Sequence, residues 1–169
     1  MQFGASIEET DGDLPHFEFR WDQGTEILSG VTAAVGERGC TGSIELEDEA
    51  GAVISLDLKL GLLCGIEVVV WPRTETVESL TPPQPRRQGR MTVPERRSQP
   101  GIAVLGVDVR LTARRNADET VVHLGLSTAE CADVVALADN LLLELDSKGE
   151  LAGFWLLDIP PFPSDEGRR

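Results

Sequence analysis

Hydrophobic and polar residues alternate along several stretches of the chain. The alternation is clearest at residues 16–21, 52–60 and 103–111, where every second side chain is apolar. Successive side chains of a β-strand point to opposite faces, so this pattern predicts strands with one buried face. Residues 62–71 and 151–159 are apolar at nearly every position and predict strands that are covered on both faces. The chain is therefore expected to be mainly β.

One short helix is expected near residues 128–139. Ser127 and Glu130 have the spacing of a capping box, in which the two side chains bond free amides of the first helical turn. The residues that follow place an apolar set on one helical face: Cys131, Val134, Val135 and Ala138. Asp139 and Asn140 would end this helix.

The segment Thr81–Pro100 differs in composition from the rest of the chain. It holds five prolines and five arginines, with Glu95 as its single acid, and its local net charge is +4. Proline fixes φ and removes a backbone donor, so a central strand or a helix interior is not expected here. We interpret residues 74–100 as a linker or long loop. The alternative is a basic strap that lies over an acidic surface of this chain or of a partner.

Four residues of the first half recur in the second half at a constant offset of 88 positions. They are Gly61, Leu63, Gly65 and Pro72, matched by Gly149, Leu151, Gly153 and Pro160. In each half the motif follows an alternating strand and opens an apolar one, which predicts a hairpin with glycine in its turn. We therefore expect two similar antiparallel sheet units, at residues 14–73 and 101–162. They would be related by a pseudo-twofold axis and share one core, as a sandwich or a partly open barrel.

The second half closes on a sequence with a known counterpart. Residues 143–157 correspond to the pattern Val-Asp-Tyr-Asp-x-x-Gly-x-Val-x-Gly-Ile-Glu-Ile-Leu, and residues 120–126 correspond to a preceding strand of the type Ala-Leu-Tyr-Ile-Arg-Leu. Residues 61–69 repeat the ending more faintly. This half resembles a family of small bacterial domains of unknown function, from which it departs by having Phe154 and Trp155 in place of Ile-Glu. The resemblance implies a compact β-rich fold and no assigned activity.

Length and charge exclude several classes of protein. The 169 residues suffice for one domain or two small ones, and the formal net charge is −14. Nucleic-acid binding and docking on an anionic membrane are not expected, because both require a cationic surface. The chain has no run of about 18 apolar residues, so no membrane-spanning helix is expected. No secretory signal is visible at the N-terminus, and a cytoplasmic location is the simplest expectation.

The sequence contains no recognisable catalytic or metal-binding constellation. Cys40, Cys64 and Cys131 form no C-x-x-C pair, which indicates neither a disulfide framework nor a zinc site and favours a reduced setting. His16 and His123 have no carboxylate or thiol at ligand-like spacing. We therefore expect no catalytic residue, no metal and no cofactor.

The aromatic residues supply the candidate ligand site. Trp21 lies on an apolar strand face, and Trp71 and Trp155 lie on strands that are apolar throughout, so core packing is favoured for all three. If a cavity exists between two β layers, Trp71, Phe154 and Trp155 are expected to line it.

Two functions are compatible with these observations, and the sequence assigns neither. The first is a non-catalytic acidic binding protein whose partner is a basic protein or a second copy of the chain. The second is a small-molecule binding protein, or an enzyme, with an apolar pocket between β layers. The absence of convergent catalytic groups and the acidic charge favour the first.

Overall fold

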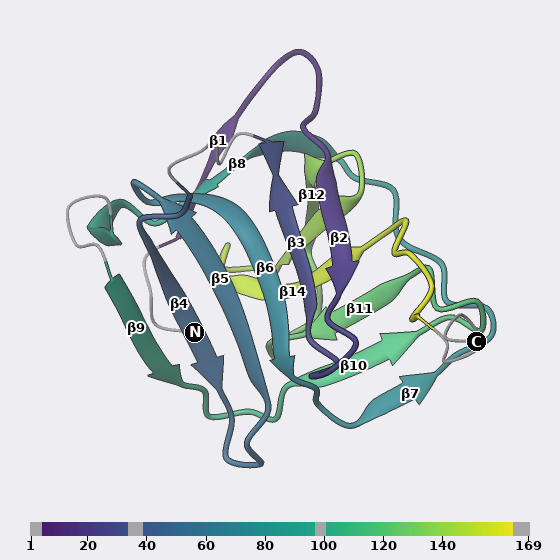
Figure 1. The fold of residues 1–169 in the computed structure, drawn as a ribbon. Helices are drawn as coiled ribbons and strands as arrows, with labels where there is room; N and C mark the ends of the chain where they lie inside the picture. Colours follow the sequence, from purple (N-terminus) through teal and green to yellow (C-terminus); the bar gives the residue numbers. More distant parts are fainter. Residues whose placement is uncertain (1–4, 34–38, 97–100, 164–169) are drawn as a thin grey trace.

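Strands dominate the computed structural model, which describes residues 5–33, 39–96 and 101–163 (Figure 1). Strands account for 51% of the structure, and no helix among the described residues reaches seven residues. The strands form a curled, open sheet with the shape of a half-barrel. The expected mainly β class is therefore confirmed, and the architecture is the open, barrel-like one of the two that the sequence allowed.

The first half of the chain forms a unit of five antiparallel strands. In chain order they are β2 (Phe17–Trp21), β3 (Leu28–Thr32), β4 (Gly42–Glu47), β5 (Val53–Lys59) and β6 (Leu62–Val70). Across the sheet the order is β2-β3-β6-β5-β4, because β6 folds back between β3 and β5. Leu56 and Leu58 of β5 are buried while Asp57 between them is half-buried, which is the alternation that the sequence predicted.

The second half of the chain has the same arrangement. Its strands are β10 (Thr112–Arg115), β11 (Val122–Gly125), β12 (Asp133–Ala138), β13 (Leu141–Leu145) and β14 (Leu151–Leu156). Across the sheet the order is β10-β11-β14-β13-β12, again with every neighbouring pair antiparallel. Each strand of this unit therefore has a counterpart in the first unit, both along the chain and across the sheet.

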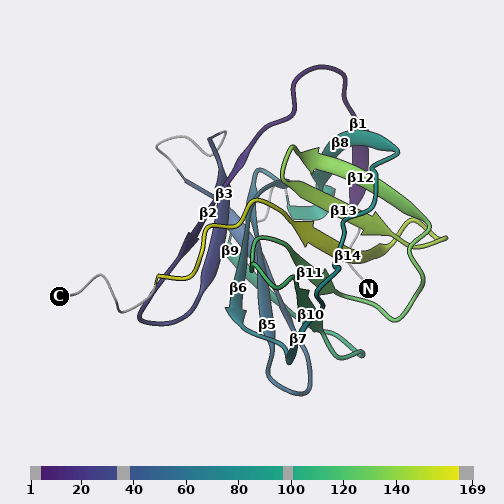
Figure 2. The same ribbon diagram turned by 90° about the vertical axis from the view of Figure 1, so that its right-hand side faces the viewer.

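Four further strands of the described residues border or join the two units. They are β1 (Ser6–Glu9), β7 (Thr74–Thr76), β8 (Arg87–Thr92) and β9 (Gly101–Gly106). β9 runs parallel to β4, β8 runs parallel to β12, and β7 runs parallel to β10. Figure 2 shows β8 beside β1 and β12, and β8 also pairs with β6 through Leu62 and Thr92. β8 therefore connects the two units.

The connecting segment is not the linker or long loop expected at residues 74–100. Its described part contributes β7, β8 and a short 3-10 helix at Pro94–Arg96, while residues 97–100 lie outside the described residues. The prolines stand on both sides of β8 and none lies within it, so the backbone donors of this strand remain available. Gly89 and Met91 are buried and Arg90 between them is exposed, so β8 has the alternation of a strand. This strand was not predicted from the sequence because prolines and arginines dominate the segment.

The helix expected near residues 128–139 is absent, and the segment forms β12 instead. The expected capping box is not formed. Ser127 instead closes a local turn, in which the Ala129 amide donates a hydrogen bond to the Ser127 hydroxyl at 3.0 Å. A strand follows since apolar residues continue at almost every position and both faces of β12 are covered. Val135 belongs to the main core and Val134 to a smaller cluster on the opposite face.

Both hairpins predicted from the repeated glycines are present. β5 and β6 form the first, and β13 and β14 form the second. Gly61 and Gly149 lie in the two turns with φ of 83° and 77°. Glycine adopts such positive φ values at low cost, which explains why both turns carry it. The two turns differ in length, however. Lys59 pairs with Leu62 around the first, in which Leu60 also has a positive φ of 51°, whereas the second spans residues 146–150.

In each hairpin a glycine faces an acidic residue on the neighbouring strand. Gly65 lies opposite Asp57, Gly153 lies opposite Glu144, and the strand register shifts directly beside each pair. A Cβ at Gly65 would lie 2.8 Å from a carboxylate oxygen of Asp57, and a Cβ at Gly153 would lie 3.0 Å from one of Glu144. The two glycines thus leave the space that these carboxylates occupy.

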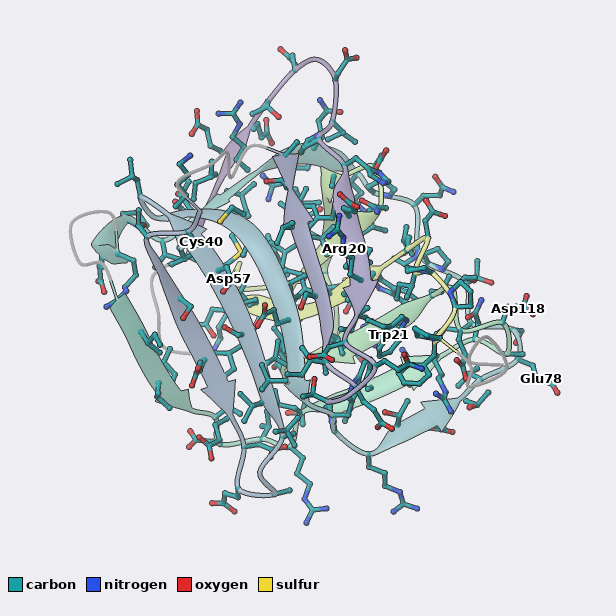
Figure 3. All side chains as sticks on the ribbon, viewed as in Figure 1. Arg20, Trp21, Cys40, Asp57, Glu78 and Asp118 are labelled. Carbon is teal, nitrogen blue, oxygen red and sulfur yellow. The ribbon has the colours of Figure 1, made fainter. Side chains whose placement is uncertain are left out.

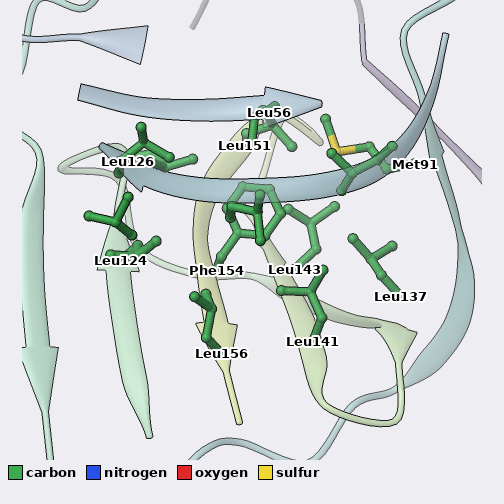
Figure 4. Packing of buried hydrophobic residues seen from close by; sticks show 14 of the residues in the cluster. Leu56, Met91, Leu124, Leu126, Leu137, Leu141, Leu143, Leu151, Phe154 and Leu156 are labelled. Atoms are coloured by element: carbon green, nitrogen blue, oxygen red, sulfur yellow. The ribbon is translucent and has the colours of Figure 1, made fainter. Parts of the chain in front are cut away.

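Both units bury apolar side chains in one common core. It includes Leu56 from the first unit, Met91 from β8, and Leu124 and Phe154 from the second unit (Figure 4). A smaller cluster lies on the other face of the second unit and consists of Val134, Ala136, Leu142 and Trp155. Because a buried methylene contributes about 0.8 kcal/mol, the common core is the main source of stability for both units.

We expect Gly153→Ala to destabilise the protein by about 2 kcal/mol. The added Cβ would lie 2.6 Å from the carbonyl oxygen of Leu124, a backbone atom of the neighbouring strand. Gly106→Ala is the matched control, since a Cβ there would have no atom within 4 Å, and its effect should stay within about 0.5 kcal/mol. Urea-unfolding midpoints measure both variants. Equal stabilities would contradict the close approach of strands at Gly153.

Candidate functional site

An open cleft lies where strand ends of the two units meet. Its volume is about 350 Å³, within the usual range of ligand pockets. Aromatic side chains form one part of its lining: Trp21, Trp71 and Phe162. The rest of the lining consists of Glu26, Thr74, Arg115, Glu119 and Val122. We refer to this site as the tryptophan cleft.

Two stacked indole rings form the centre of the cleft. The ring centroids of Trp21 and Trp71 are 5.7 Å apart and their planes differ by 23°. Trp21 is the last residue of β2, and Trp71 directly follows β6, where Pro72 interrupts the apolar run. β3 pairs with both strands and brings the two residues together. Stacked aromatic pairs of this kind contribute about 0.5–1.5 kcal/mol beyond the area they bury.

Hydrogen bonds fix the orientation of both indole rings. The Trp21 Nε1–H donates to the carbonyl oxygen of Pro160 at 2.9 Å, and the Trp71 Nε1–H donates to that of Glu26 at 2.9 Å. Both indole N–H groups therefore already donate to backbone carbonyl oxygens of the protein. The cleft therefore offers rigid apolar ring surfaces to a ligand.

The proline-rich segment at residues 159–163 runs against this pair. Ile159 is buried in the common core and anchors the segment. The Phe162 ring packs edge-on against Trp21, with 5.2 Å between centroids and an interplanar angle of 77°. Together with the bond to Pro160, this contact places the chain's own Pro-Pro-Phe-Pro sequence on one side of the cleft.

Two acidic side chains, Glu26 and Glu119, line the cleft together with Arg115. Arg115 forms an ion pair with Glu119 at 3.3 Å, and its Nε–H donates to the Thr76 hydroxyl at 3.4 Å. Figure 3 shows Glu78 and Asp118 on the same side of the molecule as Trp21. Exposed ion pairs of this kind contribute little to stability.

The structure separates the three residues that were expected to line one cavity. Trp71 lies in the tryptophan cleft. Phe154 is completely buried in the common core. Trp155 is its neighbour in β14 and faces the opposite side, in the smaller apolar cluster. Adjacent residues of a strand point to opposite faces, so Phe154 and Trp155 do not share a pocket.

The other seven residues that line the cleft were not predicted as a site. Trp21 was assigned to the core, although its place at the end of a strand leaves it half-buried. Phe162 follows two prolines, and Arg115 ends a short strand. The pattern Pro-Pro-Phe-Pro was a usable signal for an extended segment, but its contact with Trp21 spans about 140 residues of sequence and could not be inferred.

A second polar group, around Glu144, lies beneath the surface of the second unit. The Glu144 carboxylate accepts a hydrogen bond from the Trp155 Nε1–H at 2.5 Å and lies 3.1 Å from His123 Nε2. Arg114 is only a donor and lies 3.3 Å from His123 Nδ1, which assigns the ring proton to Nε2. The His123 and Glu144 side chains are 11% and 12% exposed. The contact between histidine and carboxylate was not expected from their sequence spacing.

Hydrogen bonding decides the charge of Glu144. Burial by itself would raise its pKa, but the bonds from His123 and Trp155 outweigh burial and lower the pKa below its ordinary value of 4.5. The carboxylate is therefore ionised at neutral pH. Its partners are all used inside the protein, so the group holds β11, β13 and β14 together.

The outer face of the first unit is acidic and has an apolar edge. Glu45 and Glu67 lie opposite the same residue of β5, so both share a face with Asp57 two positions further on. On the edge strand β9, Ile102 and Val104 are 69% and 58% exposed. Burial and the charge of Glu67 raise the pKa of Asp57 from 3.8 to about 6. This face combines repelling carboxylates with exposed apolar groups.

No helix among the described residues is long and apolar enough to cross a membrane. Histidine, cysteine, aspartate and glutamate side chains of the described ranges form no group of three or more that could hold a metal ion.

Comparison with the models of known protein families gives no match for the chain, and no curated protein matches it either. The resemblance to small bacterial domains of unknown function therefore stays a prediction.

Glu144→Gln is expected to destabilise the protein by about 2 kcal/mol at pH 7, because the amide cannot accept both hydrogen bonds. The lowered pKa means that the carboxylate stabilises the fold above pH 4.5, and that this contribution is lost as the pH falls through the lowered pKa. The stability difference between wild type and variant should therefore shrink on acidification. Urea midpoints measured at pH 7 and below pH 4 test this, and a constant difference would contradict it.

Asp57→Asn should stabilise the protein at pH 8 by about 1 kcal/mol, a value reduced for solvent screening. The pKa of Asp57 is about 6 in the folded chain and 3.8 in the unfolded chain. Ionisation of Asp57 therefore lowers the free energy of unfolding as the pH rises from 3.8, and the full loss is reached above about pH 6. At pH 3.5 variant and wild type should be equally stable. Glu45→Gln on the neighbouring strand controls for the change in net charge. A destabilised Asp57→Asn protein at pH 8 would refute the assignment.

Proposed function

We propose that the protein is a non-catalytic interaction module that binds an extended, proline-containing segment of a partner in the tryptophan cleft. The observation that carries this proposal is the contact between the cleft and the chain's own residues 159–163. An indole N–H bonds a proline carbonyl, and an aromatic residue between prolines packs against the same ring.

The chemistry of proline-rich segments supports this assignment. Such a segment favours the polyproline II conformation, which has no internal hydrogen bonds and leaves its carbonyl groups free to accept bonds from a partner. It also loses little conformational entropy on binding. Grooves lined by aromatic side chains recognise it through ring contacts and a few donors. Trp21 and Trp71 supply those ring surfaces, and their hydrogen bonds hold them in place.

Space and charge support an external partner in addition to the chain's own segment. The cleft retains about 350 Å³ beside Phe162, enough for several further side chains. Glu26 and Glu119 line it, and the net charge of the chain is −14. A partner segment with arginine or lysine next to its prolines would therefore be attracted, and its association would weaken with salt.

A planar small molecule is the second candidate, because a cavity of this volume with aromatic lining also fits a single ring system. A second copy of the chain is the third, since its own proline-rich segment could enter the cleft of a neighbour. Peptide binding, ligand-induced shifts of the melting temperature and the oligomeric state distinguish these occupants from a partner peptide.

We also infer that the two units arose by duplication of one five-stranded unit. Three observations support this: the same strand order in both units, a positive-φ glycine in the turn of each matching hairpin, and the glycine that faces an acid beside a register shift. The equivalent parts are β2–β6 and β10–β14. The expected second half began at residue 101, but β9 pairs with β4 of the first unit and lies outside the correspondence.

The test compares the full chain with a chain that ends after Ile159, which keeps the buried anchor and opens the cleft. Fluorescence anisotropy measures binding of a labelled peptide, Arg-Pro-Pro-Phe-Pro-Arg. The shortened chain should bind it about 10-fold more tightly, because the tethered segment no longer competes. In the shortened chain, Trp71→Ala should weaken binding about 10-fold, equivalent to about 1.4 kcal/mol. Val70→Ala, an exposed neighbour, should leave it unchanged.

Circular dichroism first establishes that each variant is folded. No binding to either chain, or binding that Trp71→Ala leaves unchanged, would contradict the proposal. A planar compound that raises the melting temperature of the wild type but not of Trp71→Ala, with no peptide binding, would identify the small-molecule alternative. Dimers that form only when residues 160–169 are present would identify exchange between copies.

A further inference from the structure

The sulfur atoms of Cys40 and Cys64 lie 3.0 Å apart. Cys40 precedes β4 and Cys64 lies within β6, 24 residues along the chain. Figure 3 shows Cys40 close to Asp57 near the end of β5. We propose that this pair is a reversible disulfide site, which forms by exchange with a small disulfide of the oxidised-glutathione class. The sequence spacing gave no indication of this pair.

Backbone and side-chain bonds hold Cys40 in place through its neighbour. The Thr41 amide donates to the carbonyl oxygen of Leu58 at 2.8 Å, and the Leu60 amide donates to the Thr41 hydroxyl at 2.9 Å. Thr41 is therefore attached to the turn between β5 and β6. This attachment positions Cys40 over the same end of the sheet as Cys64.

The irregular pairing of β5 with β6 accounts for the position of Cys64. Asp57 pairs with Gly65 and Leu58 pairs with Leu63, so Cys64 is the extra residue at the register shift. Its thiol donates to the carbonyl oxygen of Asp57 at 3.4 Å. The side chain is 2% exposed and has Cys40 as its neighbour on the outer side.

The two cysteines differ in access, which sets the order of the exchange. Cys40 is exposed, so its thiolate attacks one sulfur of the small disulfide and releases one small thiolate. The buried thiol of Cys64 then attacks the Cys40 sulfur as a thiolate and releases the second. The two departing thiolates take up the two protons, and the two electrons given up by the protein reduce the small disulfide.

The surroundings favour the disulfide once it has formed. Burial raises the pKa of both thiols, and the charge of Asp57 adds to this effect while Lys59 opposes it. Neither thiol is thus stabilised as a thiolate, and the reduced form gains no advantage from ionisation. Formation should therefore be slow at neutral pH and faster in alkali.

The bond would connect the start of β4 to β6 across the whole β4–β5 hairpin. It would thereby restrain the part of the sheet that ends in the edge strand β9. Closing a loop of this length restricts the unfolded chain, so the oxidised protein should melt on the order of 5–10 °C higher than the reduced protein.

The experiment uses the full chain with Cys131→Ser, which removes the remaining cysteine. The reduced protein is equilibrated in glutathione buffers of increasing oxidised fraction, and free thiols are then blocked with N-ethylmaleimide. Intact mass spectrometry should show a monomer that has lost two hydrogen atoms and takes up no label. Peptide mapping should place the bond between Cys40 and Cys64, and dithiothreitol should restore two labelled thiols and the lower melting temperature.

Cys40→Ser in the same background is the matched control, because it changes an exposed residue and leaves Cys64 without a partner. It should keep one thiol and show no rise in melting temperature. Three products of the two-cysteine protein would each overturn the proposal: two labelled thiols in fully oxidised buffer, a glutathione adduct on Cys40 alone, or a disulfide between two chains.

Discussion

The burial of two apolar sheet faces in one core is the interaction on which the rest of the structure depends. Each five-stranded unit is open and curled, and the side chains that fill the space between the units come from both of them and from β8. The connecting segment pairs through β8 with β12, β1 and β6, and Thr92 alone pairs with both β1 and β6. A chain segment rich in proline and arginine thus takes part in the central architecture, because its prolines flank the strand and do not interrupt it.

The candidate functional site is a consequence of this packing. Strand ends of both units meet at one place, where Trp21 and Trp71 from the first unit lie beside Arg115 and Val122 from the second. Ile159 of residues 159–163 is buried in the core, and Pro160 and Phe162 then contact Trp21. The site therefore requires both units in their observed arrangement. Close strand packing also explains two glycines. Gly65 and Gly153 have no side chain, which leaves room for the carboxyl groups of Asp57 and Glu144 on the neighbouring strands.

Local patterns predicted most strands and both hairpins, because alternation and turn glycines are properties of neighbouring residues. Local patterns gave the wrong structure at β12, because residues that are apolar at almost every position also fit one face of a helix. They missed β8 because its alternation is short and prolines flank it. The site was predicted only at Trp71. The contacts of Trp21 with Phe162, of Cys40 with Cys64 and of His123 with Glu144 all depend on strand pairing or packing across the fold. Spacing along the chain carries no information about such contacts.

Unfolding followed at separate places in the molecule tests the common core most directly. Trp155→Phe leaves only the tryptophans of the cleft as fluorescent reporters, and the double variant Trp21→Phe and Trp71→Phe leaves only Trp155 in the second unit. If the two units share one core, the fluorescence of each variant and its circular dichroism should change at the same urea concentration. Transitions of the cleft and of Trp155 at different urea concentrations within one protein background would show that the units are stable independently and would contradict this account.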